Sequence, residues 1–72
     1  MSQSVFSYVI YLLHEIAESW GTTPGEVYFT LKNSGCLDNY IIPNYDTLHT
    51  LGTSYIVNDI TEYLRIRGIQ PC

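Results

Sequence analysis

The apolar residues of the first twenty positions recur with the spacing of a helix. They return every three or four residues, at Val5, Val9, Leu12, Leu13, Ile16, Ala17 and Trp20. This spacing gathers apolar side chains on one helical face, whereas a half-buried strand would alternate apolar and polar residues. We therefore predict a helix that ends at Gly21, because glycine is the usual residue just past a helix end.

Residues 22–35 carry the start and stop signals of a second helix. Thr23 is the predicted N-cap, Pro24 suits the first helical position, and Glu26 would complete a capping box with Thr23. Gly35 marks the predicted end of this helix.

The segment 36–51 has a weaker pattern. Asp38 is predicted to cap a short helix that runs through Ile42. Pro43 disfavours helical backbone at the residue before it, so the pattern predicts a break there and another short helix over residues 44–51.

The last helix is predicted from the break at Gly52 and from an apolar stripe. Thr53 or Ser54 is the predicted N-cap. The stripe consists of Ile56, Val57, Ile60, Tyr63 and Leu64.

The end of this helix is also signalled. Arg65 and Arg67 fall in the last turn, where cations interact favourably with the helix dipole, and Gly68 closes the helix. Ile69 is expected to fold back as the apolar contact of that cap. Together these patterns predict an all-α fold, a compact single domain of four to five short helices over residues 1–72. Its predicted core is Val9, Leu13, Ile16, Trp20, Val27, Leu31, Leu48, Ile56, Ile60 and Leu64.

The length of the chain limits how much surface it can bury. A chain of 72 residues buries about 60% of the surface that its unfolded form exposes, and such small domains often gain stability from a partner. Phe6, Ile10 and Ala17 lie off the main stripe of the first helix, so we predict that the protein is a homo-oligomer through this second face.

The charge of the chain limits the classes of partner that it is expected to bind. The formal net charge is −4, from three basic and seven acidic residues. Lys32, Arg65 and Arg67 are too few to neutralise a phosphate backbone or an anionic membrane, so neither nucleic acid nor membrane is an expected partner. Residues 24–42 have the outline of a helix-turn-helix, but the recognition segment would carry an acid and no base. Because of this outline, a helix-turn-helix-like regulator that binds nucleic acid is the alternative to a protein-interaction module.

The cysteines and the apolar run near the start indicate the cellular setting. Cys36 and Cys72 do not make the disulfide framework of a small secreted domain. The apolar run at residues 5–13 is far shorter than the roughly 20 residues of a membrane span, and no signal-peptide pattern accompanies it. We predict a cytoplasmic protein with reduced thiols.

Residues 45–64 contain the most distinctive motif, which includes Leu48-His49-Thr50 and Gly52. It continues through Tyr55-Ile56-Val57, Asp59-Ile60 and Tyr63-Leu64. The motif resembles the LHT-x-G-x-x-YIV-x-DI-x-x-Y ending of a family of short bacterial proteins of unknown function, family 3791. The resemblance implies a bacterial protein whose partner is an ADP-ribosyltransferase-like protein, with an adaptor or antitoxin-like role. It supplies no functional residues.

The same motif raises a question of chemistry at His49, which has Asp46 three positions before it and Asp59 on the next helix. A general base needs a reachable substrate and usually a second catalytic group. We predict instead a structural clamp in which Asp59 ties the last helix to the His49 segment, with Thr50 and Thr53 satisfying backbone groups at the turn. A small-molecule site that uses His49 and Asp59 is the alternative.

Metal and cofactor chemistry have weak support. His14, His49, Cys36 and Cys72 lack the spacing of a metal site. A Cys36–His49 nucleophile would need a cation to lower the thiol pKa, and an inert thiol is favoured. No cofactor, metal or catalytic residue is predicted, and the protein is not expected to be an enzyme.

A candidate interaction surface lies on the first helix. Tyr8, Tyr11, Glu15 and Glu18 share one side of it, outside the apolar face. Tyrosine supplies large amphipathic contact area, which suits protein contacts, although a solvated face is the alternative. The leading hypothesis is a non-catalytic protein-interaction module.

Overall fold

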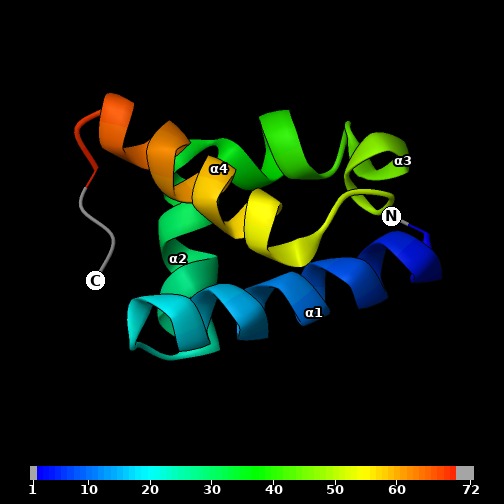
Figure 1. The fold of residues 1–72 in the computed structure, drawn as a ribbon, viewed down its shortest axis with the longest axis horizontal. Helices are drawn as coiled ribbons and strands as arrows, with labels where there is room; N and C mark the ends of the chain where they lie inside the picture. The colour runs from blue at the N-terminus through cyan, green and yellow to red at the C-terminus, as the bar shows by residue number, and fades with distance from the viewer. Residues whose placement is uncertain (1, 70–72) are drawn as a thin grey trace.

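Five helical segments follow one another in the computed structural model, which describes residues 2–69 (Figure 1). They are α1 (Gln3–Trp20), α2 (Pro24–Ser34), the π-helix η1 (Leu37–Ile41), α3 (Tyr45–Leu48) and α4 (Thr53–Ile66). No strand occurs within residues 2–69. The predicted all-α class with four to five short helices is confirmed.

α1 and α4 run side by side in the same direction, and α2 rises steeply from the end of α1 (Figure 1). Side chains join α1 to α4 in matching order, with Tyr11 bonded to Thr53 and Trp20 to Thr61. η1 and α3 form the return path from α2 to the start of α4.

The predicted ends of α1 and α2 are confirmed. Gly21 and Gly35 both have left-handed backbone, with φ of 72° and 83°, which glycine adopts at little cost. At the start of α2, the Thr23 hydroxyl accepts a hydrogen bond of 3.2 Å from the backbone N–H of Glu26. These local signals set where the chain turns between α1 and η1.

The end of α4 forms the predicted cap. Gly68, with φ of 77°, donates its N–H to the Arg65 carbonyl at 3.0 Å, and Ile69 donates to the Leu64 carbonyl at 2.9 Å. This pair of bonds defines a Schellman motif. Ile69 packs against the core, as predicted.

The predicted cap at the start of α4 is wrong. Gly52 occupies the N-cap position and makes no side-chain cap bond, while Thr53 is the first helical residue. The Thr53 hydroxyl is instead 2.8 Å from the Tyr11 hydroxyl, so a contact with α1 replaces a local cap.

The predicted break at Pro43 is confirmed, because η1 ends at Ile41 and α3 begins at Tyr45, but two details of this segment differ from the prediction. Asp38 caps nothing, because its carboxylate accepts a bond of 3.0 Å from the Lys32 ammonium. Ile42 is helical, with φ −65° and ψ −49°, although Pro43 follows it. The N–H of Ile42 bonds the Leu37 carbonyl at 3.0 Å and its side chain packs on the core, which offsets the steric preference.

α3 is shorter than the predicted helix over 44–51. It covers Tyr45–Leu48, after which Thr50 and Leu51 make turn bonds to the carbonyls of Thr47 and Leu48. The chain then passes through Gly52 into α4.

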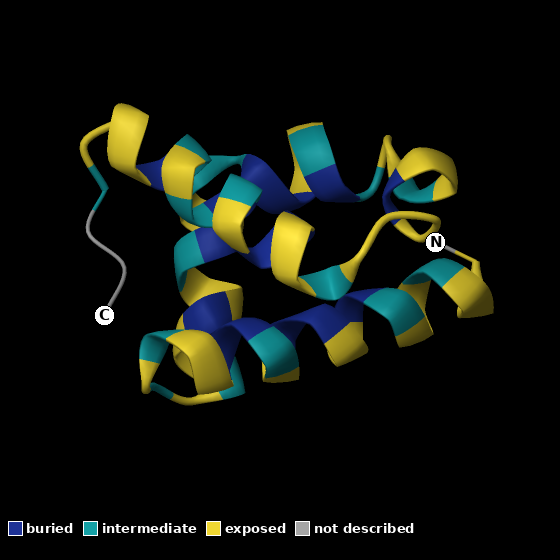
Figure 2. Ribbon diagram, viewed as in Figure 1, coloured by how far each residue is buried: buried dark blue, intermediate teal, exposed yellow. Residues whose placement is uncertain are grey.

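The core lies where α1, α2, η1 and α4 meet, and Figure 2 shows their buried faces turned inward. Every residue of the predicted core is buried except Trp20, which is half-buried and whose indole N–H donates to the Thr61 hydroxyl at 2.9 Å. Ala17 is buried and does not belong to a second face. The core also includes Leu12, Ala17, Cys36, Leu37, Ile41 and Val57.

Candidate functional site

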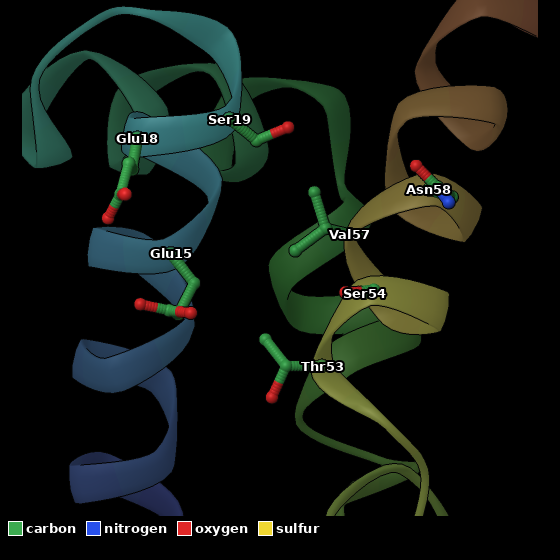
Figure 3. Close-up of a pocket in the computed structure, with 7 residues that line it drawn as sticks. All are labelled: Glu15, Glu18, Ser19, Thr53, Ser54, Val57 and Asn58. Carbon is green, nitrogen blue, oxygen red and sulfur yellow. The ribbon is translucent and has the colours of Figure 1, made fainter.

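A groove of about 380 Å³ lies between α1 and α4 (Figure 3). One wall comes from α1 and the other from α4, and side chains of Thr53 and Val57 point from α4 toward α1. The lining residues are Glu15, Glu18, Ser19, Thr53, Ser54, Val57 and Asn58. Thus two residues of the predicted interaction surface and one of the predicted clamp meet in one place.

A side-chain hydrogen bond joins α1 to α4 near each end of the groove, and we call these two bonds the ties. The Tyr11 and Thr53 hydroxyls are 2.8 Å apart, and the Trp20 indole N–H donates to the Thr61 hydroxyl at 2.9 Å. At about 1.5 Å per residue, the two ties lie roughly 14 Å apart along α1. They fix the two helices relative to each other and leave the space between them open.

The groove carries negative charge that no neighbouring cation balances. Within residues 2–69, neither Glu15 nor Glu18 forms an ion pair. The cations act elsewhere: Lys32 pairs with Asp38 at 3.0 Å, Arg65 pairs with Glu62 at 2.6 Å, and Arg67 lies 4.3 Å from the centre of the Tyr63 ring. Glu15 and Glu18 are therefore available to a cationic group from outside.

The floor of the groove is apolar. Val57 is only 6% exposed and belongs to the core cluster, while Ser54 and Asn58 beside it are exposed. The groove thus combines an apolar floor with polar and acidic walls.

The predicted surface of two tyrosines and two glutamates is divided by the structure. Tyr8 turns toward Tyr45, with ring centroids 5.4 Å apart and an edge-to-face angle of 72°. The Tyr8 hydroxyl is buried and has no hydrogen-bond partner within residues 2–69, and burial raises the pKa of Tyr8. Tyr11 is 46% exposed and stands at one end of the groove. The exposed part of the predicted surface is thus Tyr11 and Glu18, and Glu15 between them is half-buried.

The predicted clamp does not form around His49. His49 is exposed, its Nδ1 lies 2.8 Å from the Tyr45 carbonyl oxygen, and its ring stacks on Tyr45 with centroids 4.7 Å apart. Thr50 donates its hydroxyl proton to the Thr47 carbonyl at 2.7 Å. Both residues therefore bond within their own turn.

Asp59 ties α4 to η1 instead of to the His49 segment. Its carboxylate accepts a hydrogen bond from the Tyr40 hydroxyl, and the Tyr40 ring stacks on Tyr63 with centroids 5.6 Å apart. Burial and the Asp59 carboxylate raise the pKa of Tyr40. Asp59 and Tyr63 are one turn apart on α4, so both face the same neighbour, which is η1 rather than α3.

Several residues of the site escape sequence reasoning. Ser19, Ser54 and Asn58 line the groove, and Tyr40 donates to Asp59. Ser54 and Asn58 fall at unspecified positions of the 45–64 motif, and Ser19 and Tyr40 lie outside it. The spacing of Ser54 and Asn58 on one helical face was the available signal, and it gains meaning only when α1 is placed opposite.

The chemistry of the remaining reactive groups is limited by their surroundings. Burial raises the pKa of the Cys36 thiol to about 12, so it stays protonated at neutral pH. Cys72 lies outside the described residues. Within residues 2–69, no group of three or more His, Cys, Asp or Glu side chains could hold a metal ion. The groove is lined by neither His49 nor Asp59.

The helix-turn-helix alternative can be compared with the structure. The predicted recognition segment of a helix-turn-helix contains the π-helix η1, whose Leu37 and Ile41 are buried and whose Asp38 pairs with Lys32. As for membranes, none of the helices in the described part of the chain has both the length and the apolar character needed to cross one.

Comparison with known proteins gives one family. No curated protein and no solved structure matches the chain. The family described as Protein of unknown function (DUF3791) matches residues 7–67, which include the 45–64 motif, all of α2 and all of α1 after its first four residues. The match therefore extends well beyond the last third of the chain. The chain belongs to this family of proteins of unknown function.

Proposed function

We propose that this protein is a non-catalytic interaction module that binds another protein through the groove between α1 and α4. The observation that carries the proposal is the groove itself, whose walls are joined by ties at both ends and whose carboxylates are unpaired within residues 2–69. Tyr11, exposed at one end, adds the kind of amphipathic contact area that protein interfaces favour.

We further propose a bacterial, cytoplasmic setting and an ADP-ribosyltransferase-like partner, for which the protein would act as an adaptor or antitoxin-like subunit. The support is the family resemblance of the 45–64 motif and the acidic balance of the chain, which suits a basic partner.

Site-specific crosslinking in the native host tests the proposal. A photo-crosslinking amino acid replaces Asn58, which lines the groove, and in a matched control it replaces Asn33, an exposed asparagine on α2. We expect a discrete protein adduct from position 58 and none from position 33. Equal adducts from both positions, or an adduct only from position 33, would contradict the assignment of the groove.

A further inference from the structure

We infer that the occupant of the groove is a basic side chain, arginine in particular, carried on an extended segment of the partner protein. This inference rests on the proposed function and adds the chemistry of the group that is recognised.

The hydrogen-bonding character of the groove favours a donor-rich ligand. The Glu15 and Glu18 carboxylates are acceptors only, and Ser19 adds a hydroxyl beside them. The guanidinium of arginine offers N–H donors and no acceptor, so it complements such a wall. Hydrogen bonds between ionised partners are stronger than neutral ones.

The floor of the groove suits the stem of the same side chain. Arginine and lysine bury their aliphatic stems on apolar surface while the charged head stays with polar groups. Val57 supplies the apolar floor from α4, and Glu15 and Glu18 lie across from it on α1 (Figure 3). One amphipathic side chain thus meets both features of the groove.

The size of the groove favours a side chain or an extended segment over a helix. Its volume of about 380 Å³ lies near the lower end of ligand pockets. The direct ties from Tyr11 to Thr53 and from Trp20 to Thr61 leave no space between α1 and α4 for a helix of about 10 Å diameter.

The two carboxylates also favour arginine over lysine. Glu15 and Glu18 are one turn apart on α1 and can face a single planar group. A guanidinium can bond two acceptors with its fixed fork, whereas an ammonium acts as a point charge. The chain's own Lys32, Arg65 and Arg67 contact other residues and do not fill the groove.

An NMR titration of the full chain tests the inference without the partner. The probes are a short capped Gly-Arg-Gly peptide, the same peptide with lysine, the same peptide with neutral citrulline, and magnesium chloride. We expect the arginine peptide to shift the amides of residues that line the groove, the lysine peptide to bind more weakly, and citrulline to cause no shift. Raising the salt concentration should weaken the binding.

Charge-matched variants connect the shifts to the groove. Glu15→Gln with Glu18→Gln should weaken binding of the arginine peptide by about tenfold or more. The control, Glu26→Gln with Asp46→Asn, removes the same charge from exposed positions outside the groove and should bind like the parent.

Three results would overturn the inference: equal shifts with arginine and citrulline, equal loss in both double variants, or the same shifts with magnesium alone. A crosslinked adduct at position 58 together with no response to the arginine peptide would keep the proposed function and reject only the basic occupant.

Discussion

Three side-chain hydrogen bonds join parts of the chain that are far apart in sequence. They are Tyr11–Thr53, Trp20–Thr61 and Tyr40–Asp59, which span 42, 41 and 19 residues. Each includes an aromatic side chain whose ring lies on the protein and whose polar end reaches a partner. A typical bond of this kind contributes about 0.5–1.5 kcal/mol, and one to a charged group contributes more. The polar ends of these aromatic residues therefore add specific contacts to the apolar packing that positions α4.

The Tyr40–Asp59 pair should contribute measurably to stability. Tyr40→Phe removes the donor and leaves the Asp59 carboxylate without that partner, so we expect a loss of about 1–3 kcal/mol. Asp59→Asn should also lower the melting temperature, because it replaces a charged acceptor by a neutral one. Thermal melts of the two variants and of the double variant give the coupling between the residues. An unaltered melt for Asp59→Asn would contradict this role.

His49 should matter much less. Its ring is exposed, and within residues 2–69 its hydrogen bond and its aromatic stacking both involve Tyr45 of its own turn, so His49→Ala is expected to cost less than Asp59→Asn. The same thermal melts compare the two substitutions.

Buried weak acids should make the fold sensitive to alkali. Burial raises the pKa of Cys36 from 9.0 to about 12 and also raises the pKa of Tyr40. Above about pH 9 the unfolded chain releases the thiol proton while the folded chain keeps it, so stability falls as the pH rises from 9 toward 12. Melting temperatures measured in reductant should therefore decrease across this range. Cys36→Ala should show a shallower decrease, and an equal slope in both proteins would contradict the assignment.

At the scale of helices, residues next to each end determine most boundaries. Gly21, Gly35 and Gly68 take left-handed backbone, and Thr23 caps α2, so these ends could be predicted from the sequence alone. The π-helix η1 could not be predicted, because the choice between wide and normal turns depends on which side chains the core accepts. Leu37 and Ile41 are buried there against residues from other helices.

The glycines offer a test of these boundaries. Alanine at Gly35 would need left-handed backbone, and its Cβ would lie 2.9 Å from the side-chain amide nitrogen of Asn39. We therefore expect the free energy of unfolding to fall by about 1–2 kcal/mol or more. Gly21→Ala has the same backbone strain with nothing within 4 Å and should cost less. Gly25→Ala, inside α2 with free space around it, should stabilise by about 0.4–1 kcal/mol. In chemical denaturation, the free energy of unfolding should be lowest for Gly35→Ala, higher for Gly21→Ala and highest for Gly25→Ala. A Gly25→Ala variant that is less stable than the parent would contradict this ranking.

At the scale of the whole molecule, the site depends on how two distant helices meet. The spacing of Glu15 and Glu18 on α1 was visible in the sequence, but the opposite wall, with Ser54 and Asn58, lies about forty residues away. Only the packing of α4 beside α1 brings the two walls together. The two glutamates of the groove could thus be predicted from one helical face, and the rest of its lining required the fold.

The small core should make large-to-small substitutions severe. Leu13 and Ile60 belong to the buried cluster, so replacement of either by alanine should cost about 2–5 kcal/mol, a large share of the stability of so small a domain. Phe29 is 65% exposed, and Phe29→Ala should melt close to the parent. If the Leu13 and Ile60 variants also melted like the parent, the placement of these residues in the core would be wrong.

Self-association is the prediction that concerns the outer surface of α1. Phe6 and Ile10 lie one turn apart and are 55% and 39% exposed, so covering them with a second copy would remove apolar area from water. We expect the average mass in sedimentation equilibrium, measured in reductant, to rise with protein concentration. Phe6→Glu should keep the protein monomeric, since each copy would place a charge in the contact. Phe29→Glu introduces the same charge on α2 and should associate like the parent. A parent protein that stays monomeric at high concentration, or equal association of the two variants, would contradict a contact through Phe6 and Ile10.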